Sequence, residues 1–175
     1  CGNKTYNFLT DKAYTAIRSV ADTTLFTVSD VDVYEGRILN ETLNISDTIL
    51  SNSNIDTRSL KVTVNGATYT YRSDVFGVKS TDKVFYLQPE NDSKYSIQFG
   101  RDRFGTQPTI TDSISATYRT TVGAPANGVE SLTLGAFGGA SSIGIEVTQT
   151  SSGGRDSEDI DSIRAFAPKA SQIQE

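Results

Sequence analysis

Apolar and polar side chains alternate most regularly along Leu60–Tyr71, which predicts two strands joined by a tight turn. Asn65–Gly66 is the preferred pair for a two-residue type I′ hairpin turn. Such a turn sets three pairs of opposite residues: Val64 with Ala67, Val62 with Tyr69, and Leu60 with Tyr71. The apolar side chains then share one face, so the sequence predicts a hairpin with one side on a core and the other in water.

Similar β-branched and aromatic segments recur along the chain, separated by turn residues every dozen positions or so. They are Leu25–Val28, Val31–Tyr34, Arg37–Ile45, Val84–Gln88, Tyr95–Phe99, Ser113–Thr121, Ser131–Leu134 and Ile143–Thr148. This spacing favours a mainly β protein, either an antiparallel β-sandwich or an open barrel, over alternating strands and helices. We expect residues 1–150 to form one β-rich module; the alternative is two small β subdomains divided near residue 80.

Two segments depart from the strand pattern. Asp11–Val20 has apolar residues at helical spacing and is either a short helix or an irregular strand. At the other end, residues 151–175 read as a hinge at Gly153 and Gly154 followed by a short helix. Asp156 is a good N-cap, and Pro168 predicts that the helix ends near Ala167.

This predicted helix has only about three turns, too few to be stable alone in water. Its apolar face therefore needs a neighbour, and we expect Ile160, Ile163 and Phe166 to dock it onto a following domain or another subunit. The chain begins with Cys1 and contains no Met, so we expect an internal piece of a longer polypeptide that continues into a further domain.

Composition excludes several classes of function. The net charge of −5 and pI near 4.8 argue against a nucleic-acid partner. No apolar run approaches the roughly 20 residues of a membrane span. The chain has no His, which removes the usual catalytic triads and zinc sites, and we expect no cofactor, no metal site and no enzymatic activity. Asp30 and Asp32 could act as paired carboxylates, but an exposed strand face is the favoured interpretation.

The aromatic residues of the β-rich region have two interpretations. They are Tyr69, Tyr71, Phe85, Tyr86, Tyr95, Phe99 and Phe104. Alternating aromatic side chains in a β-domain usually pack its core, which is the favoured interpretation. The alternative is a sugar-stacking surface, which the absence of Trp makes weaker.

Several segments follow one another in an order that suggests a family. Val84–Gly105 reads as a strand, a polar turn and a strand ending in Phe-Gly; Tyr118–Gly128 (YRTTVGAPANG) and Ser151–Lys169 (SSGGRDSEDIDSIRAFAPK) follow. In this order they resemble the baseplate J-like family of contractile-tailed phages, and within it the large baseplate wedge proteins of T-even-like phages. The resemblance covers roughly residues 84–169, whereas the first eighty residues match only in their β-character.

The resemblance implies a structural, non-enzymatic subunit of the virion's tail baseplate, assembled in the cytoplasm of a bacterial host. Its expected partners are other copies of itself, as in a homodimer, and other baseplate wedge proteins. Two further classes stay open. One is a receptor- or carbohydrate-binding β-module of a tail fibre or adhesin, and the other is a glycosidase that uses two carboxyl groups, one with a raised pKa.

Overall fold

The computed structural model describes residues 4–22, 24–134 and 143–156. The chain divides into two compact units, Cys1–Thr121 and Val122–Glu175, which are described separately below. The protein is mainly β, as the sequence predicts, and its largest element is a curled half-barrel sheet in the first unit. The predicted boundaries at residue 150 and near residue 80 stay predictions.

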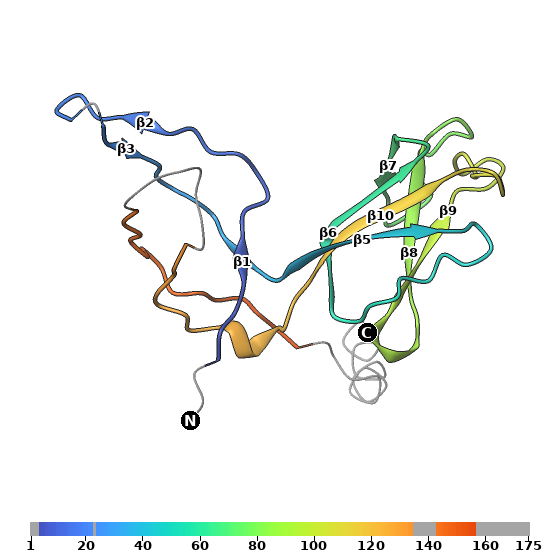
Figure 1. The fold of residues 1–175 in the computed structure, drawn as a ribbon. Helices are drawn as coiled ribbons and strands as arrows, with labels where there is room; N and C mark the ends of the chain where they lie inside the picture. Colours follow the sequence, from blue (N-terminus) through green and yellow to red (C-terminus); the bar gives the residue numbers. More distant parts are fainter. Residues whose placement is uncertain (1–3, 23, 135–142, 157–175) are drawn as a thin grey trace, which may run out of the picture. The chain divides into compact units, whose positions relative to one another are not determined.

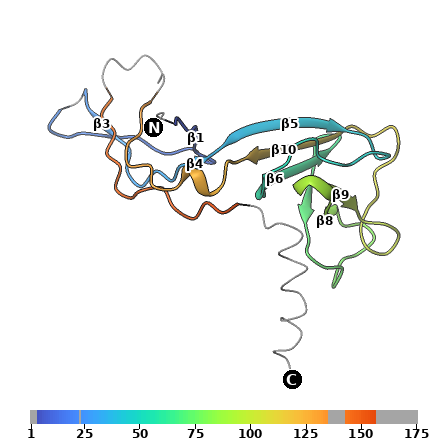
Figure 2. The same cartoon turned by 90° about the horizontal axis from the view of Figure 1, so that it is seen from below.

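The half-barrel is a six-stranded sheet (Figure 1). Its strands, in spatial order, are β5 (Arg37–Leu43), β10 (Ile114–Thr120), β6 (Ile55–Val64), β7 (Ala67–Tyr71), β8 (Val84–Pro89) and β9 (Tyr95–Phe99). Figure 2 shows β5, β10 and β6 side by side. A 3₁₀ turn, η1 (Asn91–Ser93), joins β8 to β9.

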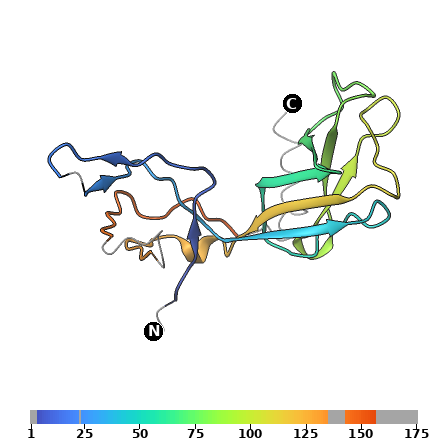
Figure 3. The same cartoon turned by 45° about the horizontal axis from the view of Figure 1, so that its top comes forward.

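The sheet curls because the chain that leaves β5 returns to the strand at the opposite edge (Figure 3). Leu50 N donates to Tyr95 O, and Ile97 N donates to Thr48 O. The segment after β5 therefore pairs with β9, while β5 itself pairs with β10. After a turn at Asn44–Asp47, the chain that formed one edge of the half-barrel thus continues along the other edge.

The predicted hairpin is confirmed at its turn. Val64 pairs with Ala67, and Val62 pairs with Tyr69. The φ angles of Asn65 and Gly66 are 49° and 79°, the left-handed values that a type I′ turn requires.

The predicted antiparallel sheet is wrong at one pair of strands. β7 and β8 are parallel, and Tyr71 pairs with Phe85 instead of with Leu60. A parallel pair needs a crossover connection. Residues 72–83 supply it without a helix, so no change of sequence period marks it.

The core lies inside the half-barrel and contains alternate residues of several strands. It consists of Leu43, Leu50, Ile55, Val62, Val64, Tyr69, Phe85, Ile97, Ile114, Ala116 and Tyr118. Tyr69 and Phe99 pack edge to face with ring centroids 5.4 Å apart. The core interpretation of the aromatic residues is confirmed for Tyr69 and Phe85, but Tyr71 and Phe104 are exposed.

Before the half-barrel, the chain forms two short ribbons. β1 (Phe8–Leu9) pairs with β4 (Tyr34–Glu35), and β2 (Ile17–Arg18) pairs with β3 (Phe26–Thr27). The helical interpretation of Asp11–Val20 is therefore wrong, and the irregular-strand alternative is the better description.

The strand expected at Val31–Tyr34 begins only at Tyr34, so Asp30 and Asp32 do not share a strand face. Asp30 instead has a φ of 55°, which breaks the extended conformation. Asp32 lies in an ion pair with Lys12, whose Nζ is 3.2 Å from Asp32 Oδ2. The favoured interpretation, an exposed strand face, is therefore wrong here, and the alternative of paired carboxylates on one strand face is not formed either.

The second unit contains one 3₁₀ turn, η2 (Ala124–Ala126), and otherwise irregular chain in its described residues. The strands expected at 131–134 and 143–148 are wrong. Leu134, Ile143 and Ile145 are exposed there, and no other described strand pairs with them. Residues 157–175 lie outside the described residues. The predicted helix, with Ile160, Ile163 and Phe166, therefore stays a prediction.

Candidate functional site

Two segments of the second unit, residues 123–129 and 151–156, are tied together by hydrogen bonds; we call them the clasp. Gly128 N donates to Ser151 O at 2.8 Å, and Ser151 N donates to Val129 O at 3.1 Å. The Ser151 hydroxyl donates to Ala126 O at 2.6 Å and accepts from Val129 N at 2.8 Å. A single half-buried serine therefore makes four hydrogen bonds to the opposite segment.

An asparagine side chain completes the clasp, because its amide group pairs with a backbone N–H and a backbone C=O as a neighbouring strand would. Asn127 Nδ2 donates to Gly154 O at 2.9 Å, and Gly154 N donates to Asn127 Oδ1 at 2.8 Å. Asp156 Oδ1 accepts from Ala124 N at 3.0 Å. Asp156 is thus held immediately before the predicted helix that it is expected to cap.

The clasp joins the two segments that carry most of the family resemblance. Gly153 and Gly154, the predicted hinge residues, lie inside it. Gly153 has a φ of 83°, whereas Gly154 is held by the Asn127 amide. Whether the chain pivots there stays a prediction, but any pivoting at Gly154 breaks two hydrogen bonds.

The ribbon of β2 and β3 exposes apolar side chains. Ile17 is 67% exposed, Phe26 is 58% exposed, and Val20, beside the turn, is fully exposed. Ile17 pairs with Thr27, so Phe26 points to the opposite face of the ribbon. A two-stranded ribbon with apolar groups on both faces has no core of its own to cover them, which is typical of a contact with other chains.

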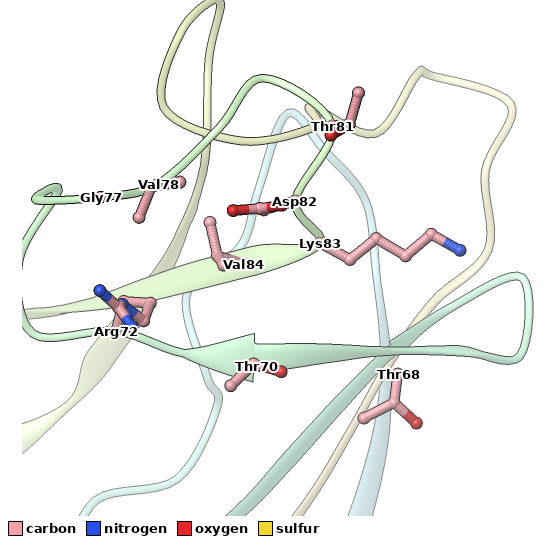
Figure 4. Close-up of a pocket in the computed structure, with 9 residues that line it drawn as sticks. All are labelled: Thr68, Thr70, Arg72, Gly77, Val78, Thr81, Asp82, Lys83 and Val84. Atoms are coloured by element: carbon pink, nitrogen blue, oxygen red, sulfur yellow. The ribbon is translucent and has the colours of Figure 1, made fainter.

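A polar hollow of about 450 Å³ lies where the parallel strands β7 and β8 meet their crossover loop. Figure 4 shows its lining residues: Thr68, Thr70, Arg72, Gly77, Val78, Thr81, Asp82, Lys83 and Val84. Arg72 Nη2 donates to Phe76 O at 2.9 Å, so it braces the loop. The hydroxyl and cationic groups suit a polar ligand, but no aromatic ring lines the hollow to stack against a sugar.

A second, smaller hollow of about 320 Å³ borders Glu41 at the edge of the half-barrel. Glu41 accepts hydrogen bonds from the Tyr118 hydroxyl, from Asn52 Nδ2 at 2.9 Å, and from both Ser51 N and Ser51 Oγ at 3.1 Å. Burial alone would raise the pKa of Glu41, but these hydrogen bonds outweigh it and lower the pKa.

The pKa shifts that are resolved for carboxyl groups in the described part of the chain all have the same direction. Where a shift is resolved, at Asp22, Glu41, Asp56 and Asp112, the pKa is lowered, whereas a glycosidase's acid needs a raised pKa. Within residues 4–22, 24–134 and 143–156, no three His, Cys, Asp or Glu residues gather as metal ligands. The described helices are all too short to cross a membrane.

No model of a known protein family matches this chain, and no curated protein matches it. The resemblance to the baseplate J-like family therefore stays a prediction that depends on the order of its segments.

Proposed function

We propose that this chain is a structural subunit of a contractile phage tail baseplate. It would be a wedge component of the virion that associates with copies of itself and with other wedge proteins. The observation that carries the proposal of an assembly role is the apolar β2–β3 ribbon. The assignment to a baseplate is supported by the ordered resemblance of residues 84–169 alone.

The ribbon supports assembly because its exposure is unfavourable in an isolated chain. Each Å² of apolar surface that a partner covers contributes about 25 cal/mol. Ile17, Val20 and Phe26 together therefore offer a compact source of binding free energy. Since apolar groups lie on both faces, a partner that contacts both faces of the ribbon would bury more apolar surface, and gain more binding free energy, than one that covers a single face.

In this proposal the half-barrel is an open barrel that acts as a rigid body. The clasp sets the direction in which the chain continues. The short helix after Gly153–Gly154 would carry Ile160, Ile163 and Phe166 to a neighbouring domain or subunit. Rearrangement of the wedges during sheath contraction would then act at this joint.

The experiment is incorporation of full-length variants into wedges, measured by co-purification with the other wedge proteins. A double variant, Ile17→Ser with Phe26→Ser, should reduce incorporation while circular dichroism stays unchanged. The matched control is Ile110→Ser, because Ile110 is also exposed but lies in a turn of the half-barrel. Normal incorporation of the folded double variant would remove the ribbon from the proposal.

The same assay tests the helix. Ile163→Asp should block incorporation, because a charge on the docking face would have to be buried in the interface. Unimpaired assembly of this variant would contradict docking through the helix. It would not bear on the ribbon, which the double variant tests separately.

The polar hollow beside β7 and β8 favours a second candidate, a carbohydrate-binding β-module of a tail fibre or adhesin. Thr70, Arg72 and Lys83 offer hydroxyl and cationic groups to an acidic saccharide. A glycan array probed with the chain tests this candidate. Binding that disappears in the Arg72→Ala variant would support it, and an array without signal would reject it.

A further inference from the structure

Arg119 is a buried cation at the end of β10. It is only 5% exposed, and its Nη2 lies 2.5 Å from Asp56 Oδ2. Arg119 N donates to Ser59 Oγ at 2.8 Å, and the Ser59 hydroxyl donates to Asp56 O at 2.6 Å. The charge is therefore paired, and the backbone around it is fixed by a serine.

A register shift between β10 and β6 sets the position of this charge. Thr117 pairs with Lys61, but Arg119 pairs with Asp56. Residues 57–60 of β6 therefore lie opposite the single residue Tyr118. The shift leaves Arg119 opposite Asp56, near the start of β6, where the guanidinium and the carboxylate form their ion pair.

A three-residue segment, Tyr34–Gly36, covers Arg119; we call it the strap. The Tyr34 ring centroid is 4.7 Å from the guanidinium carbon, within cation–π range. Gly36 lies so close that an added Cβ would be 2.4 Å from Thr120 O and 2.5 Å from Arg119 Cγ. With a φ of 140°, Gly36 also has a backbone conformation that other residues rarely adopt.

On its other side the strap is paired, through its backbone, with a strand of only two residues. β4 pairs with the two-residue strand β1, and Gly36 N donates to Asn7 O at 2.9 Å. Strand pairs as short as β1 and β4 belong to the parts of a protein that open locally without unfolding the core.

The closed position also has a cost. In the part of the chain that the structure describes, Arg119 Nε is buried and has no hydrogen-bond partner. A buried donor without an acceptor destabilises the arrangement that buries it. Opening the strap would let water reach Nε. The cation–π contact therefore favours the closed position, and hydration of Nε favours the open one.

We propose that the strap is a conformational latch that closes over Arg119 and pivots at Gly36. Closed, it fixes the N-terminal ribbons to the half-barrel; open, it exposes the Arg119–Asp56 pair and frees the ribbons. The latch does not depend on which assembly the chain enters, although it sets the position of the ribbon that assembly would use.

The experiment measures how fast phenylglyoxal, which modifies arginine, reacts with Arg119 in the full chain, with peptide mass spectrometry as the readout. Arg58 is the internal reference, because its side chain is 90% exposed. Arg119 should react more slowly than Arg58, at a rate that is insensitive to low urea, because local opening exposes little surface. A rate that rises with urea as steeply as global unfolding would overturn the latch, and so would a rate equal to that of Arg58.

A pair of variants separates the ring from the hydroxyl. Tyr34→Ala should accelerate the reaction of Arg119 by roughly tenfold, because the cation–π contact is lost. Tyr34→Phe keeps the ring and should react as the natural chain does. Hydrogen exchange of the β10 amides should be the same in all three chains. No acceleration in a folded Tyr34→Ala variant would overturn the proposal, and the urea dependence decides it if that variant does not fold.

Discussion

Replacing Tyr118 with Phe tests the polar network at the edge of the half-barrel. The Tyr118 ring is only 1% exposed, and its hydroxyl donates to Glu41 and accepts from Asn52 Nδ2 at 2.7 Å. Phe keeps the ring, so no cavity forms and the change isolates the hydroxyl. A hydrogen bond to a charged group contributes about 1.5–3 kcal/mol.

The expected loss lies within that range because Glu41 keeps its other donors. Ser51 N, Ser51 Oγ and Asn52 still satisfy the carboxylate, so the charge is not left unpaired. We therefore expect the free energy of unfolding to fall by about 2 kcal/mol.

The assay is urea unfolding followed by far-UV circular dichroism, with the m-value unchanged. Tyr71→Phe is the matched control, because Tyr71 is half exposed, and its free energy of unfolding should change little. Equal stabilities of the two variants would refute the reasoning. So would a double-mutant cycle with Glu41→Gln that shows no coupling between the hydroxyl and the carboxylate.

Four further outcomes follow. Burial and the hydrogen bond to Glu41 raise the pKa of Tyr118 to about 12, so ultraviolet titration should show one tyrosine ionising well after the exposed ones. Burial would raise the pKa of Asp56, but hydrogen bonds and charge, led by the bond from its arginine partner, lower it. Its stabilisation is therefore full above the unfolded pKa of about 4 and is lost as pH falls through the folded pKa; in acid unfolding, Asp56→Asn should show a weaker pH dependence. Asn127→Ala removes both side-chain hydrogen bonds to Gly154, including the acceptor of the Gly154 N–H, and should increase hydrogen exchange at Gly154, while amides of the half-barrel stay unchanged. Leu50→Ala should lower the free energy of unfolding by about 2–5 kcal/mol in urea, because Leu50 is fully buried.

The sequence predicted elements whose rules are local. Asn65–Gly66 determines both the turn and the register of β6 against β7, because the turn requires two left-handed residues in succession. β10 was also predictable, since Ile114, Ala116 and Tyr118 alternate toward the core. In both cases a few adjacent residues carry the whole signal.

Elements that depend on distant partners were not predictable in the same way. Residues 131–134 and 143–148 have the same β-branched composition as true strands but lack a described strand to pair with. The parallel pairing of β8 depends on a crossover that no helix marks. Local preference therefore identified extended segments but not the sheet to which they belong.

The candidate sites likewise combine features that the local sequence indicates with contacts that depend on distant residues. The Gly-rich and Asn-containing segments of the clasp stood out in the sequence, but nothing local indicated that Asn127 binds Gly154. Arg119 gave no signal, because the register shift that buries it arises between β6 and β10.

The most direct test of the assembly proposal is quantitative mass spectrometry of purified phage particles and isolated baseplates for peptides of this chain. The account predicts enrichment in baseplates, in fixed proportion to other tail proteins. Peptides found with detached fibres or in the soluble fraction would contradict it and favour the binding-module or enzyme alternatives.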